Sequence, residues 1–242
     1  MMHAIRITCG LLLLLAALVC LPSAAFANGT ITAQLNYPPS NNILDGIYVG
    51  PYSATNLSGG GSLQMICDDF KDESNYSAAT YTVNTISSLG NAIWASLPNA
   101  TQLYEQAAWL ALGMLQVTGT QQGYYSYALW AVFDPTDVLN WLKAYGDTGA
   151  CNAIFGSGNN CNSTTVTGGL LQQAQLNYAS GNYSNVLILT PNCSGALCQE
   201  QEFFLFAPEG GSALLYLLLS GASCLGAVWQ SRRHTSGPAR AA

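Results

Sequence analysis

The chain has 242 residues, of which half are hydrophobic and only 7% are charged. Between residues 28 and 207, two lysines face eleven acidic residues, which gives a net charge of −9 and argues against a nucleic-acid partner, because nucleic-acid binding depends on Lys and Arg. The same segment has no histidine and no arginine, which excludes Ser-His-Asp and Cys-His catalysis within it.

The N-terminal segment predicts export. Arg6 precedes an apolar stretch at residues 11–21, and Ala25-Phe26-Ala27 fits the small-x-small pattern before a signal-peptidase cut. We therefore expect residues 1–27 to be a signal peptide. Residues 28–207 then form one ectodomain, which is long enough to bury a core of its own.

Strand patterns stand at both ends of this ectodomain. Alternation and β-branched content predict strands at residues 30–37, 46–50, 62–67 and 81–86, and two late strands at residues 186–189 and 202–206. Helical periodicity predicts helices at residues 101–116, 122–133, 137–145 and 168–179. The sequence therefore predicts an α+β fold, a single small ectodomain with N- and C-terminal strands around a central helical segment.

The C-terminal segment has the pattern of a membrane anchor. Residues 213–229 carry no charge, and their length is at the lower limit for a helix that crosses a hydrocarbon core of about 30 Å. Arg232 and Arg233 follow, and positive charge tends to remain in the cytoplasm. We expect a transmembrane helix at residues 213–229 and a cytoplasmic tail at residues 234–242.

The residues before and after this apolar run carry a resemblance. The sequence PEGGSALLYLLL, followed by a patch of small residues and two arginines, is similar to the C-terminal sorting signal of the PEP-CTERM family of bacterial exported proteins, in its PEGGS form. The resemblance implies that residues 208–233 are read by an exosortase, a membrane transpeptidase that cuts near the Pro-Glu element. It also implies a location in the cell envelope or outside the cell, with membrane anchoring before processing. The sorting residues that it implies are Pro208, Glu209, Gly210, Gly211, Arg232 and Arg233.

Cysteine spacing predicts two disulfides in the ectodomain. Cys151 and Cys161 bracket one short, turn-rich loop, and Cys193 and Cys198 bracket another, in a chain expected to reach an oxidising compartment. Cys67 is then the odd cysteine and a candidate reactive thiol. The wide spacing and the absence of histidine argue against zinc, and we expect neither a metal nor another cofactor.

Cys67 ends a predicted strand, and two predicted helices follow, one with Ala107-Ala-Trp-Leu110 and one with Ala128-Leu-Trp130 near its end. This order is weakly similar to thioester domains of bacterial surface adhesins. In those domains a cysteine thiol condenses with a glutamine side chain on a later segment. Here Ser126 stands at the glutamine position, in Tyr-Ser-Tyr-Ala-Leu-Trp, and a serine cannot form that bond. The other interpretation of Cys67 is a buried free thiol, which behaves as a small hydrophobic residue.

Acidic residues offer two further interpretations. The loop at residues 68–73 has several oxygen ligands for calcium, but its spacing matches no EF-hand and we favour a solvated acidic turn. Asp68 or Asp69 with Glu105 or Asp134 would supply the two carboxylates of a glycoside hydrolase.

Aromatic residues are dense on the helical segment. They are Trp94, Tyr104, Trp109, Tyr124, Tyr125, Tyr127, Trp130, Trp141 and Tyr145. Trp and Tyr stack on sugars, so an exopolysaccharide is a candidate partner, although we favour a core stripe at helical spacing.

Taken together, the sequence predicts an exported protein of the cell surface or extracellular matrix with a structural or adhesive role and no catalytic residue. The alternative is a secreted carboxylate-dependent glycoside hydrolase.

Overall fold

The computed structural model describes residues 29–37, 43–71, 76–165, 167–193 and 200–206. These residues belong to one compact unit, Phe26–Ala207. The expected signal peptide, the sorting residues Pro208, Glu209, Gly210, Gly211, Arg232 and Arg233, and the expected transmembrane helix lie outside the described residues. In the part of the chain that the structure describes, no helix is both long and apolar enough to cross a membrane.

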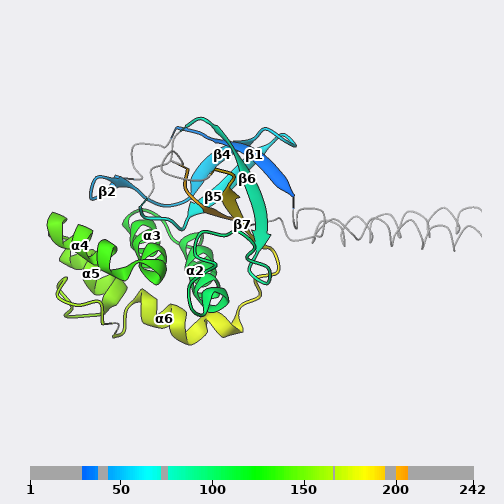
Figure 1. The fold of residues 1–242 in the computed structure, drawn as a ribbon. Helices are drawn as coiled ribbons and strands as arrows, with labels where there is room; N and C mark the ends of the chain where they lie inside the picture. Colours follow the sequence, from blue (N-terminus) through cyan, green and yellow to red (C-terminus); the bar gives the residue numbers. More distant parts are fainter. Residues whose placement is uncertain (1–28, 38–42, 72–75, 166, 194–199, 207–242) are drawn as a thin grey trace, which may run out of the picture. The chain divides into compact units, whose positions relative to one another are not determined.

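Six strands form a closed antiparallel barrel (Figure 1). Around the barrel the order is β1-β4-β5-β8-β7-β6, so β1 pairs with β4 on one side and with β6 on the other. A separate hairpin joins β2 (Ile43–Leu44) to β3 (Ile47–Tyr48). The barrel strands are β1 (Thr30–Leu35), β4 (Tyr52–Asn56), β5 (Ser62–Cys67), β6 (Ala78–Thr85), β7 (Val186–Pro191) and β8 (Phe203–Phe206).

Side-chain alternation places the core of the barrel. In β1, Ile31, Ala33 and Leu35 are buried and the residues between them are more exposed, as a half-buried strand requires. β7 is buried along its whole length, which is the pattern of a strand covered on both faces. Phe203 fills part of the interior, because its ring contacts those of both Tyr52 and Tyr81 edge-on.

Five helices gather on one side of the barrel (Figure 1). Asp134 separates two of them, since a residue before proline leaves the helical region. Its carboxylate then accepts a hydrogen bond from the backbone N–H of Asp137 at 3.4 Å and caps the next helix. The helices are α2 (Ala100–Met114), α3 (Thr120–Phe133), α4 (Pro135–Tyr145), α5 (Thr148–Phe155) and α6 (Leu170–Asn177), which is followed by a 3-10 turn, Tyr178–Ser180.

Buried contacts join the helices to the barrel. The indole Nε1 of Trp130 on α3 donates to the backbone carbonyl of Cys67 at the end of β5, at 3.0 Å. The ring of Tyr104 on α2 lies edge-on to that of Phe204 on β8, with centroids 6.1 Å apart. The helices and the barrel therefore share one core on the side of the barrel formed by β5 and β8.

The predicted fold class, α+β with N- and C-terminal strands around a central helical segment, is wrong, whereas the transmembrane helix predicted with it lies outside the described residues. The strands close into a six-stranded antiparallel barrel, and no described helix can cross a membrane. The alternation that identifies a strand does not reveal its partners, and closure here needs pairings between distant segments, β1 with β6 and β5 with β8. The prediction also missed β2, β4 and α5.

Candidate functional site

An open hollow of about 420 Å³ lies where the β2–β3 hairpin, the residues after β5 and the helices α3 and α4 meet. We call it the aromatic hollow, because six of its lining residues are aromatic. Segments far apart in the sequence form it, so only the folded chain brings them together. Its lining residues are Gly46, Ile47, Tyr48, Tyr52, Asp69, Phe70, Lys71, Tyr76, Trp130, Trp141 and Gln201.

Ring contacts hold the walls of the aromatic hollow in place. Phe70 packs between two tryptophans, with its centroid 5.3 Å from that of Trp130 and 6.0 Å from that of Trp141. On the hairpin side, Tyr48 and Tyr52 meet edge-on at 4.5 Å. Such pairs add stability beyond their buried area, so the rings are ordered without a ligand.

Two buried polar residues contribute to the lining. The side-chain amide of Gln201 donates to the backbone carbonyl of Asp69 at 3.0 Å, and both residues are nearly inaccessible. The carboxylate of Asp69 accepts from the backbone N–H of Lys71, also at 3.0 Å. These bonds fix a carboxyl group and an amide group at the bottom of a largely aromatic concavity.

Lys71 supplies the positive charge of the lining, and it is paired. Its Nζ lies 2.5 Å from a carboxylate oxygen of Asp134 and 3.3 Å from one of Asp137. The hydrogen bond with Asp134 is the main cause that raises the pKa of Lys71 above its ordinary value. The amine therefore stays charged, and the carboxylates of Asp134 and Asp137 neutralise it, which leaves the aromatic hollow without an excess of positive charge.

Beside the aromatic hollow, a carboxyl pair is buried between the barrel and α2. Glu202 accepts hydrogen bonds from the hydroxyl of Tyr104, from that of Thr190 at 2.5 Å and from the backbone N–H of Ile93 at 3.0 Å. Asp68 is fully buried, and neither of its carboxylate oxygens meets a hydrogen-bond partner among the described residues.

The surroundings of this pair decide which carboxyl holds a proton. Burial is the first cause, and the charge of Glu202 the second, that raises the pKa of Asp68 well above its ordinary value. Burial also raises the pKa of Glu202, but the bonds from Thr190, Tyr104 and Ile93 oppose that rise. The proton therefore belongs on Asp68, and Glu202 carries the charge.

The predicted solvated acidic turn is wrong for its first two residues, because Asp68 is fully buried and Asp69 is 2% exposed. Asp72 and Glu73 lie outside the described residues. Among the residues that are described, no group of three or more His, Cys, Asp and Glu side chains is arranged to hold a metal ion.

The four carboxylates of the hydrolase interpretation do not share the aromatic hollow. Asp69 lines it, whereas Asp68 is buried beside it. Asp134 is bound to Lys71 outside the lining. Glu105 lies on α2, where its charge is the second cause, after burial, that raises the pKa of Tyr183.

The sulfur of Cys67 is enclosed. Its thiol donates to the backbone carbonyl of Asp69 at 3.0 Å, and burial raises the pKa of the thiol well above its ordinary value. A reactive cysteine needs an accessible thiolate, so these surroundings favour an inert, neutral thiol. Ser126, at the position of the thioester glutamine, accepts from the backbone N–H of Gly50 at 2.8 Å and donates to the carbonyl of Gln122.

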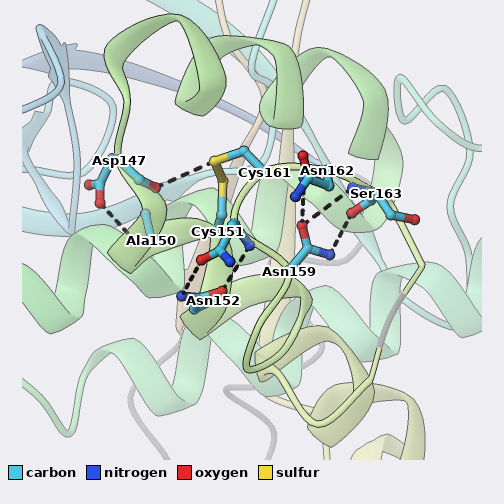
Figure 2. Close-up of a disulfide and its surroundings, with 9 residues drawn as sticks. Asp147, Ala150, Cys151, Asn152, Asn159, Cys161, Asn162 and Ser163 are labelled. Atoms are coloured by element: carbon cyan, nitrogen blue, oxygen red, sulfur yellow. Dashed lines mark hydrogen bonds between the residues drawn. A yellow bond between two sulfur atoms is a disulfide. The ribbon is translucent and has the colours of Figure 1, made fainter.

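The disulfide between Cys151 and Cys161 is confirmed, with Cα atoms 5.2 Å apart (Figure 2). It ties α5 to the loop that follows. Asp147 caps the same helix by accepting from the backbone N–H of Ala150 at 2.9 Å. For the second predicted pair, Cys193 is described but Cys198 lies outside the described residues.

The predicted core stripe of aromatic residues divides in two. Tyr104, Tyr127 and Trp130 are core residues, as favoured. Trp141 lines the aromatic hollow, and Tyr145 stacks on it with centroids 5.1 Å apart.

The sequence did not single out Tyr48, Tyr52, Tyr76 or Gln201 as functional residues. A usable signal for the first two was their position on either side of Gly50-Pro51, where tyrosines stand in a turn-rich stretch.

Comparison of the chain with models of protein families, with curated proteins and with solved structures finds no match. Function is therefore inferred from the aromatic hollow and from the sequence.

Proposed function

We propose that this protein is an exported adhesive protein of the cell surface or extracellular matrix, and that it binds a glycan in the aromatic hollow. The observation that carries this proposal is the combination of aromatic walls with a buried carboxyl group and a buried amide group in one open concavity. The C–H faces of a sugar pack on aromatic rings, and its hydroxyl groups both donate and accept hydrogen bonds, which suits Asp69 and Gln201.

Export and sorting are the second part of the proposal. They rest on the N-terminal signal pattern and on the tail with Pro208, Glu209, Arg232 and Arg233, which resembles a PEP-CTERM signal. The Cys151–Cys161 disulfide supports an oxidising compartment. An exosortase-type transpeptidase in the membrane is the partner that this tail calls for.

We propose a binding role without catalysis. A glycoside hydrolase of the usual kind holds two carboxyl groups about 5–10 Å apart on either side of the bond that it cleaves. Of the four candidate carboxylates, only Asp69 lines the aromatic hollow. No observation favours the hydrolase over the binding protein, so the hydrolase is not proposed further.

The test compares two tryptophan variants in retention on gels that contain uncharged polysaccharides. Trp141 is half-buried and lines the aromatic hollow, whereas Trp109 is half-buried on α2 and does not. The full chain, purified in a detergent without a sugar headgroup, should be retained by at least one polysaccharide. Trp141→Ala should weaken that retention about tenfold, the loss expected from one stacked ring, and Trp109→Ala should leave it unchanged.

Circular dichroism of both variants checks that they fold. If no polysaccharide retains the native chain, or if both folded variants lose retention equally, the aromatic hollow is not the glycan site.

A further inference from the structure

The aromatic surface continues past the aromatic hollow on its barrel side. Tyr37, two residues after β1, is 85% exposed, although a tyrosine gains by packing away from water. Its ring stacks on that of Tyr76 with centroids 5.1 Å apart and planes 29° apart. Tyr76 lines the hollow, and the side-chain amide of Gln34 fixes its backbone by donating to its carbonyl at 3.0 Å. Tyr37 is therefore a flat, exposed ring beside one edge of the hollow.

The aromatic surface also continues on the helical side. Tyr145, at the end of α4, is 53% exposed and stacks on Trp141 with planes 28° apart. Its hydroxyl lies so close to Gly46, another lining residue, that a Cβ atom there would stand 2.9 Å from the oxygen. Gly46 also has a positive φ of 77°, which a glycine adopts without strain. The turn between β2 and β3 thus makes room for an exposed ring at the second edge.

We propose that the aromatic hollow is the middle of a longer binding surface that holds the interior of a linear, uncharged polysaccharide, with Tyr37 and Tyr145 as outer contacts. This inference rests on the proposed glycan-binding function and deepens it. A small sugar needs only the concavity, whereas exposed rings stacked on two of its lining residues, Tyr76 and Trp141, add contact area for a chain that extends beyond it. Exposed apolar surface next to a pocket is characteristic of such interaction sites.

The charge of the ectodomain selects the kind of chain. Residues 28–207 carry a net charge of −9, and the lysine of the hollow is already bound to Asp134 and Asp137. An acidic polysaccharide would be repelled by the whole domain and would find no unpaired cation in the described lining. An uncharged polymer avoids both costs.

A proline-rich peptide is the other ligand that aromatic grooves accept. The buried carboxyl group of Asp69 and the amide group of Gln201 favour the polysaccharide, because a chain with many hydroxyl groups uses polar groups at the bottom of a pocket better than a proline ring does.

The experiment measures affinity against chain length by calorimetry, with the full chain in a detergent without sugars. The probes are ladders of two to eight sugars from β-1,4-glucan, β-1,3-glucan, α-1,4-glucan and β-1,4-N-acetylglucosamine, together with a proline-rich peptide. For the ladder that binds, we expect affinity to rise at least about tenfold from two sugars to six. Tyr37→Ala and Tyr145→Ala should each lower the affinity for six sugars about fivefold and leave that for two sugars unchanged. The control is Leu176→Ala, which removes an apolar side chain that is 75% exposed on α6.

The outcomes separate the two proposals. Affinity that does not grow with chain length, or equal losses for two and six sugars in the tyrosine variants, overturns the extended surface and leaves the glycan site standing. If no sugar of any length binds, or if only the peptide does, both proposals are wrong.

Discussion

The burial of Asp68 carries an electrostatic cost that depends on pH. This residue is fully buried and has no hydrogen-bond partner among the described residues, and Glu202, Asp69, Cys67 and Tyr104 are the titratable groups around it. The pKa of Asp68 is raised, so the folded chain binds its proton more tightly than the unfolded chain does. Stability from this group is therefore complete below the unfolded pKa of about 4, and it falls as the pH rises toward the folded pKa.

Asp68→Asn should remove this dependence. The asparagine cannot ionise, and its side-chain amide can donate to the charged carboxylate of Glu202. We expect the variant to be more stable than the native chain at pH 7 by about 1–2 kcal/mol, and the gain to vanish near pH 4. Urea unfolding of both chains from pH 4 to pH 8 measures this difference in unfolding free energy.

The matched control for Asp68→Asn is Glu105→Gln, which changes a half-buried acid on α2 away from the pair. If the unfolding free energies of the native chain and of Asp68→Asn change in parallel with pH, Asp68 does not hold a proton in the folded state.

At the scale of elements, the sequence predicted most segments but not how they pair. The predicted strand at residues 62–67 is confirmed as Ser62–Cys67, and the four predicted helices are confirmed with shifted ends. β4, Tyr-Ser-Ala-Thr-Asn, was missed because its inward residues include a small alanine, which gives weak contrast. α5 was taken for a loop because it is short and contains a glycine, and the Asp147 cap and the disulfide hold it.

The aromatic hollow was less predictable than the elements around it. Trp141 and Tyr145 drew attention as a cluster along a helix. Tyr48 reaches the aromatic hollow from the separate β2–β3 hairpin, and the late Gln201 reaches it from the segment before the barrel strand β8. Contacts of this kind depend on pairings between distant segments, which local periodicity does not contain.

At the scale of the whole molecule, the described residues form one compact unit between the two segments with targeting patterns. If signal peptidase removes residues 1–27 and an exosortase cuts near Pro208-Glu209, the mature chain from the native host should begin near residue 28 and lack residues 213–233. Intact-mass spectrometry of that protein checks both ends. A mature mass that still includes residues 213–233 would leave a plain membrane anchor in place of the sorting signal.

The most direct test of the central claim needs no variant at all. The chain has five tryptophans, and two of them, Trp130 and Trp141, line the aromatic hollow. Trp130 is buried, whereas the ring of Trp141 is half-buried and its Nε1 donates to the backbone carbonyl of Asp45 at 3.3 Å. In ¹⁵N-labelled full-length protein, titration with the polysaccharide fragment that binds most tightly should shift the indole N–H resonance of Trp141. The resonances of Trp94 and Trp109, away from the hollow, should stay in place. A shift confined to Trp94 or Trp109, or binding without any change at Trp141, would contradict the assignment of the aromatic hollow as the glycan site.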